Sequence, residues 1–177
     1  METLTFEFVN QCLNYCPESG SLTWKDRPRE HFKTNRGWSV FKSQFKGNNA
    51  GTVNKQGYLQ VCISHKLYRS HRIGWLLSTG KWPIHQIDHI NNNRVDNRLC
   101  NLREATNTEN SMNSSLRADN SSGIKGVSWN KRIQKWHARI YTNKKFNHLG
   151  YFETTDEAKT TVQSYRKLHH GEFAHHG

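Results

Sequence analysis

Large apolar side chains follow helical spacing at the start of the chain and strand spacing soon afterwards. Residues 4–15 carry four of them on one helical stripe, namely Leu4, Phe8, Cys12 and Tyr15. A turn and a short strand through Leu22 and Trp24 follow. This pattern predicts a first helix over most of residues 4–15, and it leaves the basic, aromatic stretch 27–49 without an assignment.

The next apolar positions predict a hairpin and a second helix. Residues 58–63 alternate between apolar and polar, and residues 67–69 return after a tight turn, which is typical of a β-hairpin. Ser70 is placed to cap a helix over 71–79, and Gly80 is placed to end it.

A polar block then separates this part from the C-terminal third. Residues 85–113 are dense in Asp, Asn, His and Arg, and Thr106 with Glu109 forms a capping box that predicts a helix to about Asn113. The block is therefore expected to fold as strand, polar loop, strand and helix. The Ser, Asn and Gly content of residues 114–123 is typical of a linker.

The C-terminal third has strand spacing and then helical spacing. Three short strands are predicted over 124–129, 135–141 and 144–151, followed by a helix that opens on a second capping box, Thr154 with Glu157. The expected fold class is α+β, with a domain over 1–113, a linker over 114–123 and a second domain over 124–177.

Charge and composition narrow the class of partner. The chain has 177 residues, a net charge of +12 and a mean hydropathy of −0.93. A large positive charge favours a polyanion, which leaves nucleic acid and an anionic membrane surface open at this point. No apolar run approaches the ~20 residues that cross a bilayer, so a cytoplasmic protein is expected. Four cysteines without a C-x-x-C pair give no support to a structural zinc site.

Four residues of the polar block have the chemistry of a metal-dependent hydrolase. Asp88 and Asn110 offer the hard oxygen ligands that Mg²⁺ or Mn²⁺ prefers. His89 could take a proton from water if a second group, such as Asn101, orients its ring. Asp, Asn and His are also turn formers, so composition alone favours a plain loop with Asx turns.

The order of these residues resembles the HNH endonuclease family, in the branch of phage and intron homing enzymes. The resemblance rests on Ile87–Arg98, Asn101–Thr106 and Asn107–Asn113, and it extends back to about residue 12. It implies a ββα-metal fold, Asp88 and Asn110 as ligands of the divalent ion, His89 as general base and Asn101 as the residue that orients it. His71 is expected to pack beside the site or to support its residues, with a phosphate contact as the alternative. Three arginines are candidates for phosphate contacts, with exposed surface charge as the alternative: Arg94, Arg98 and Arg103.

The alternation in the C-terminal strands predicts one face packed on the helix and one open face. Trp136, Ala138 and Ile140 should face the helix, together with Leu149 and Tyr151. The open face and its rim should carry the basic and aromatic residues that contact DNA, namely Lys125, Asn130, Arg132, His137, Arg139, Tyr141, Lys144, Lys145 and His148, with Phe146 beside them. A merely solvated face is the alternative.

This region also resembles the AP2 DNA-binding domain. The resemblance rests on the residues from Gly123 to Trp129, from Lys135 to Ile140 and from His148 to Phe152. Ser128, Asn130 and His148 depart from that family at positions that read the groove, so the preferred base sequence stays open.

Together these features predict a metal-dependent DNA endonuclease of the mobile phage type. A monomer with one active site would nick duplex DNA, whereas a double-strand break would need a dimer or a second binding event. The alternatives are a DNA-binding regulator that keeps the nuclease fold without catalysis, and an RNA-directed protein, which the AP2-like sheet disfavours.

Overall fold

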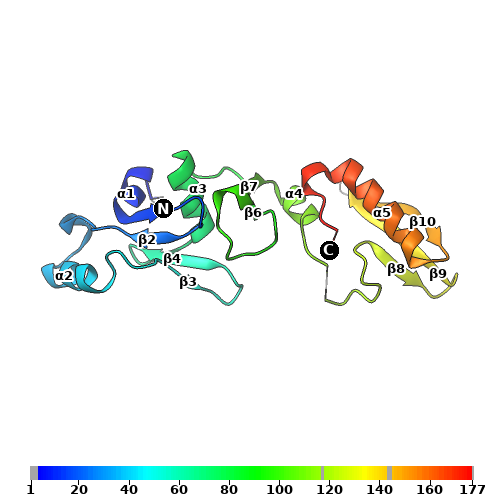
Figure 1. Cartoon of the computed structure of the whole chain (residues 1–177), viewed down its shortest axis with the longest axis horizontal. Helices are drawn as coiled ribbons and strands as arrows, with labels where there is room; N and C mark the ends of the chain where they lie inside the picture. Colours follow the sequence, from blue (N-terminus) through cyan, green and yellow to red (C-terminus); the bar gives the residue numbers. More distant parts are fainter. Residues whose placement is uncertain (1–3, 117, 143–144, 177) are drawn as a thin grey trace. The chain divides into compact units, whose positions relative to one another are not determined.

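The computed structural model describes residues 4–116, 118–142 and 145–176, and it divides into two compact units, Met1–Ala105 and Thr106–Gly177 (Figure 1). Each unit is described by itself. Lys144 lies outside the described residues. Among the helices of the described ranges, none is long and apolar enough to cross a membrane.

The first unit begins with a helix that is shorter than predicted. Helix α1 (Phe6–Cys12) is capped by Thr5, whose side chain accepts a hydrogen bond from the Phe8 N–H group. Leu13 then takes an extended conformation, and β1 (Leu13–Tyr15) pairs antiparallel with β2 (Leu22–Trp24). The apolar stripe predicted from residues 4–15 is helical only as far as Cys12, because Leu13–Tyr15 pairs as a strand.

The hairpin and the second helix of this unit are confirmed. A short strand β3 (Thr52–Val53) pairs with β4 (Leu59–Ile63), which pairs with β5 (Lys66–Arg69) across a turn in which Ser64 and His65 have positive φ. Helix α3 (Ser70–Thr79) ends at Gly80 with φ 75°. Ser70 is its first helical residue rather than its cap, because the chain enters the helix directly from β5.

Two further elements complete the scaffold of the first unit. A 3₁₀ turn η1 (Arg29–His31) and helix α2 (Asn35–Gln44) occupy the unassigned stretch. The core gathers side chains from α1, β1, β2, α2, β4 and α3, among them Val9, Leu13, Phe41, Ile63 and Ile73.

The polar block forms a second antiparallel hairpin. Strand β6 (Gln86–His89) and strand β7 (Leu102–Ala105) pair with each other, and a short 3₁₀ turn η2 (Leu99–Asn101) precedes β7. Helix α4 (Asn107–Met112) follows in the chain and carries the predicted capping box between Thr106 and Glu109. The predicted order of strand, loop, strand and helix is confirmed.

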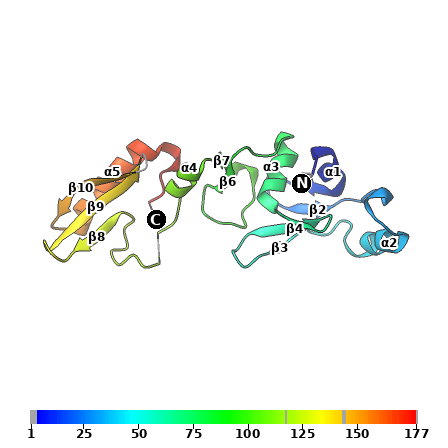
Figure 2. The same cartoon turned by 180° about the vertical axis from the view of Figure 1, so that it is seen from behind.

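The second unit contains a three-stranded antiparallel sheet and one long helix, as predicted. The strands β8 (Val127–Asn130), β9 (Lys135–Thr142) and β10 (Lys145–Phe152) lie in the order β10-β9-β8. Helix α5 (Thr155–His170) starts at the Thr154 and Glu157 capping box, packs on one face of the sheet and leads into η3 (Gly171–Phe173). Figure 2 shows the opposite face of this sheet.

The compact units do not follow the predicted domain limits. Thr106 to Asn113 group with the second unit rather than with the first, and residues 118–123 contain turns. The Ser122 hydroxyl donates to the Val127 carbonyl at 2.7 Å, and the Asn120 side chain donates to the Ile124 carbonyl at 3.2 Å. These bonds fix a stretch that its composition predicts to be flexible.

Candidate functional site

The β6–β7 hairpin carries the two residues that the sequence places at the centre of the chemistry. Asp88 and His89 are adjacent at the end of β6, and each is only 5% exposed. In the strand register Asp88 lies opposite Arg103 and His89 opposite Leu102. Because neighbouring strand residues point to opposite sides, the carboxylate and the imidazole have different surroundings.

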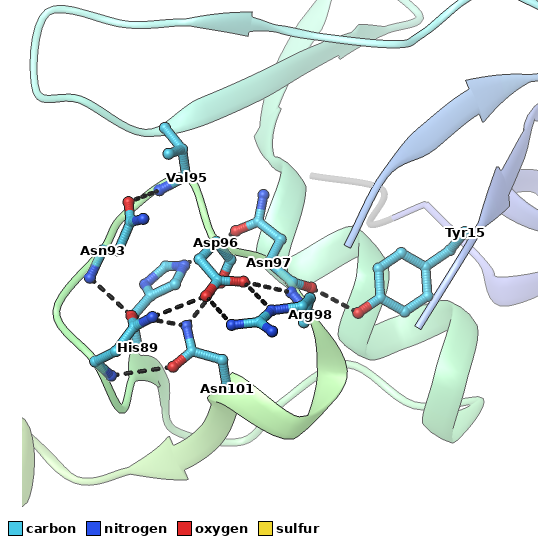
Figure 3. A network of polar contacts seen from close by, with 9 residues as sticks. Tyr15, His89, Asn93, Val95, Asp96, Asn97, Arg98 and Asn101 are labelled. Carbon is cyan, nitrogen blue, oxygen red and sulfur yellow. Dashed lines mark hydrogen bonds and ion pairs between the residues drawn. The ribbon is translucent and has the colours of Figure 1, made fainter. Parts of the chain in front are cut away.

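The imidazole of His89 is oriented by Asn97. Its Nε2 atom lies 3.0 Å from the Asn97 side-chain oxygen, and Asn97 is itself only 1% exposed. The Tyr15 hydroxyl donates to the Asn97 carbonyl at 2.7 Å, which fixes this residue from the β1 side (Figure 3). An amide oxygen can only accept, so in this arrangement Nε2 is the ring nitrogen that donates.

Asn101 does not orient His89, contrary to the prediction. Its side-chain oxygen accepts from the Asn91 N–H group at 3.0 Å, and its side-chain nitrogen donates to the Asn91 side chain at 2.9 Å and to the Asp96 carbonyl at 2.8 Å. The amide therefore ties the two ends of the loop between β6 and η2. Asn97, near the end of this loop, contacts the imidazole instead.

A carboxylate in the same loop balances the charge of Arg98, one of the arginines predicted to contact phosphate. Arg98 donates to both carboxylate oxygens of Asp96, at 2.8 and 2.7 Å (Figure 3). The Asn91 side chain donates to the same carboxylate at 2.8 Å. The Arg98 hydrogen bonds hold the pKa of Asp96 far below its usual range, with a smaller lowering from Asn91. The Arg98 side chain therefore stabilises this loop through its bonds to Asp96.

A second predicted arginine pairs with the predicted metal ligand. The Arg103 guanidinium approaches the same Asp88 oxygen with its Nη2 at 2.9 Å and its Nε at 3.0 Å, and both side chains are largely buried. Arg103 is therefore the cationic partner of Asp88, and the prediction of a phosphate contact finds no support in this geometry. The third arginine, Arg94, is exposed and donates to the Gln56 carbonyl at 2.8 Å.

The two predicted metal ligands are a carboxylate and an amide, whose oxygen atoms are of the type that a hard divalent ion prefers. Asp88 is a buried carboxylate that already faces a cationic group, and Asn110 lies on α4 in the second unit. Across the described ranges no cluster of three or more His, Cys, Asp or Glu side chains could hold a metal. Mg²⁺ commonly keeps several waters and takes only one or two protein ligands beside a substrate phosphate, and a carboxylate such as that of Asp88 is one of the ligand types it prefers.

His71 packs against the candidate base, as expected. It is 6% exposed, and its ring centroid lies 4.9 Å from that of His89 at right angles. Burial, together with the smaller effects of the charges of His89, Arg69 and Arg72, lowers the pKa of His71 to about 3. His71 is therefore neutral and acts as a wall of the site.

In the second unit the predicted alternation of β9 is confirmed. Ala138 and Ile140 are buried and Trp136 packs against the core beneath α5, whereas Arg139 and Tyr141 are exposed on the open face. One strand further, Tyr151 is placed on the wrong face by the sequence pattern. A β-bulge between His148 and Gly150 adds a residue to β10, so Leu149 stays on the core side while Tyr151 moves to the open face.

The open face carries interacting aromatic and basic side chains. The Tyr151 ring stacks on His137 at 4.9 Å, and the His137 Nε2 lies 2.9 Å from the His148 Nδ1. Arg139 lies 5.1 Å from the ring centroid of Phe146, which is 65% exposed. Burial lowers the pKa of His137, and the charges of His148 and Arg139 act in the same direction.

The rim residues divide into exposed and structural ones. Arg132 and Lys145 are exposed, whereas Asn130 uses its side-chain oxygen to accept from the Arg132 N–H group at 3.0 Å, which stabilises the β8–β9 turn. Lys125 is not a surface cation, contrary to the prediction. Its ammonium donates to the carbonyls of Met112 at 2.9 Å and His175 at 3.4 Å and also to that of Ser114, and burial lowers its pKa to about 8.

Sequence reasoning missed Asn97 entirely. It stands in a run of turn-forming residues, Asp96-Asn97-Arg98, and no spacing rule separates an Asn that caps a loop from one that reaches an imidazole.

The comparisons with known proteins add family information. A family model described as HNH endonuclease matches residues 68–112. Protein 3.8 of Escherichia phage T7 is 34% identical over 111 residues, which cover 62% of this chain and 91% of that protein. A solved structure of DNA binding and cleavage by the HNH homing endonuclease I-HmuI shares 19% identity at a TM-score of 0.43, over 64% of this chain and 57% of that one.

Proposed function

We propose that this chain, which belongs to the same family as Protein 3.8 of Escherichia phage T7 and carries an HNH endonuclease domain, is a metal-dependent endonuclease that hydrolyses DNA phosphodiester bonds. The observation that carries the proposal is the buried His89, whose Nε2 is held by Asn97. An imidazole fixed in this way can accept a proton from water through Nδ1.

The proposed reaction is hydrolysis by an activated water. His89 removes a proton from a water molecule, the resulting hydroxide attacks phosphorus, and the bond to the 3′-oxygen of the neighbouring nucleotide breaks. The products are a 5′-phosphate and a 3′-hydroxyl, and solvent returns the proton to the leaving oxygen. Buried, immobile partners favour this step because the imidazole needs no reorientation before it accepts the proton.

Asp88 and Asn110 are the residues that we expect to hold Mg²⁺ or Mn²⁺. When bound, such an ion supplies positive charge to the scissile phosphate and to the leaving oxygen. Arg103 then has a positioning role, since it fixes the Asp88 carboxylate from the neighbouring strand.

The second unit is proposed to bind duplex DNA through its open sheet face, in the manner of an AP2-like domain. Support comes from basic and aromatic side chains on one face and its rim. The exposed ones are Arg132, Arg139, Tyr141, Lys145, Phe146 and His148, the half-buried His137 lies among them, and the structure adds Tyr151. The major groove admits a β-ribbon, so strands of a narrow sheet can enter it.

The test is cleavage of supercoiled plasmid by the purified full chain. With Mg²⁺ we expect relaxation by nicking, its loss in excess EDTA, and its restoration when Mg²⁺ is returned. His89→Ala should abolish cleavage while duplex binding is retained. Unchanged cleavage by His89→Ala would remove this residue from the mechanism.

A second candidate function is a DNA-binding regulator without catalysis. The observation that favours it is the ion pair of Arg103 with Asp88, because it engages the carboxylate that the metal needs. Tight duplex binding by the wild type, with no cleavage in Mg²⁺ or Mn²⁺, is the result that would select this candidate.

A further inference from the structure

The arginines on the elements around His89 differ in how their charge is balanced. Arg98 pairs with Asp96 and Arg103 with Asp88, so the charge of both is neutralised by a carboxylate. Arg69, the last residue of β5, and Arg94, in the loop after β6, make no ion pair with any described residue. Both therefore keep their positive charge for an anion. Arg72 on α3 makes no ion pair with a described residue either, but its guanidinium donates to the carbonyls of His85 at 3.2 Å and Pro83 at 3.4 Å.

Both unpaired arginines lie against one aromatic ring. The guanidinium carbon of Arg69 is 4.3 Å from the ring centroid of Tyr58, and that of Arg94 is 5.0 Å from it. Gln56 also binds both, since its side-chain oxygen accepts from Arg69 and its backbone carbonyl accepts from Arg94 at 2.8 Å. A ring quadrupole and neutral amide oxygens attract each cation but cannot cancel the repulsion between two of them.

This pair of cations lies beside the candidate base. The Tyr58 centroid is 6.0 Å from that of His89 and 5.6 Å from that of His71. The Nη1 atom of Arg69 is buried and has no hydrogen-bond partner among the described residues, which costs free energy unless a ligand accepts from it.

We propose that Arg69 and Arg94, arranged around Tyr58 and Gln56, form the site that binds the DNA phosphate next to His89. This inference rests on the proposed nuclease function and identifies the residues that hold its substrate. Guanidinium groups suit the task because each offers several N–H donors in one plane, which matches two phosphate oxygens. Tyr58 contacts both guanidinium groups and fixes their direction, so it is a positioning residue.

The experiment compares matched single substitutions in the full chain. Arg69→Gln and Arg94→Gln are tested beside Arg36→Gln, which removes an exposed arginine of α2 in the same unit. Single-turnover nicking at saturating protein should fall about 10²-fold for each of the first two, the cost of losing one positioned donor to a transition-state oxygen. Arg36→Gln should stay within about threefold of wild type, because one exposed charge contributes little. Equal rates for all three variants would overturn the proposal.

A binding readout separates this inference from the nuclease proposal. In the His89→Ala background, anisotropy of a fluorescent duplex as a function of salt gives the number of phosphate contacts, and each lost contact lowers the slope of log K against log salt by about 0.9. A reduced slope for Arg69→Gln and Arg94→Gln supports the phosphate site even if wild type does not cleave. An unchanged slope together with an unchanged rate rejects it.

Folding of the partly buried Arg69 variant is checked by thermal unfolding, and Arg69→Lys provides a second substitution that keeps the charge. A lysine cannot reproduce the fork, so an intermediate loss of rate is expected. The site is refuted if Arg69→Lys and Arg94→Gln both show the wild-type rate and the wild-type salt slope. This outcome does not depend on whether Arg69→Gln folds.

Discussion

Asn97→Ala removes the acceptor that holds the His89 ring. The variant leaves a buried Nε2–H group without its 3.0 Å partner, and the loss of such a partner costs about 1–3 kcal/mol of the free energy of unfolding. The larger effect is expected on rate, since a reacting group displaced by about 1 Å loses roughly 10²-fold in catalysis. The Tyr15 bond to the Asn97 carbonyl involves only the backbone, so it survives the substitution.

The matched variant is Asn101→Ala, which removes the three hydrogen bonds to Asn91 and Asp96 but leaves His89 and Asn97 in place. At about 1 kcal/mol for each bond, it should lower the free energy of unfolding by roughly 3 kcal/mol. Single-turnover nicking is measured at a temperature where thermal unfolding shows both variants folded. A rate for Asn97→Ala within twofold of wild type, or a greater loss of rate for Asn101→Ala, would refute the assignment.

Three further predictions concern the second unit and pH. Lys125→Met should lower the melting temperature, because the Lys125 ammonium donates to three carbonyls. The salt dependence of duplex binding should stay unchanged, and a reduced slope would show that Lys125 contacts DNA. Arg132→Ala and Arg139→Ala should each lower that slope by about 1 without affecting cleavage chemistry, as read by single-turnover rates at saturating protein. The folded-state pKa of His71, about 3, lies below its unfolded value of about 6.5, so the unfolded state takes up the proton first and stability falls as pH drops between these values. From pH 7 to 5, urea unfolding should show wild type losing about 2 kcal/mol more than His71→Gln, and equal losses would contradict the burial argument.

Local patterns predicted most of the elements. Both capping boxes, the β4–β5 hairpin, the end of α3 at Gly80 and the three-stranded sheet with its helix were confirmed. Each depends on residues within a few positions of one another, so the chain needs no distant partner to specify it. The end of α1 was mispredicted because Leu13–Tyr15 pairs with a strand that a turn brings back onto it.

The faces of the sheet illustrate the limit of periodicity. The alternation of β9 holds along its whole length, whereas the bulge at Gly150, with φ 135°, turns Tyr151 onto the open face. A bulge changes the count by one residue and therefore inverts every position after it. The sequence offers a glycine at this point but does not state that the strand bulges there.

The sequence by itself determined which chemical groups are available: an Asp-His pair on a strand, a polar loop rich in Asn, and a second basic segment with strand spacing. Only the tertiary structure decided which groups meet. Asn97 rather than Asn101 reaches His89, Arg98 and Arg103 pair with carboxylates, Arg69 and Arg94 share Tyr58, and Lys125 turns inward. The physical reason is that amide, guanidinium and ammonium groups can each hydrogen-bond to many different partners. Which partner each one meets is therefore set by the backbone path that burial and loop geometry impose.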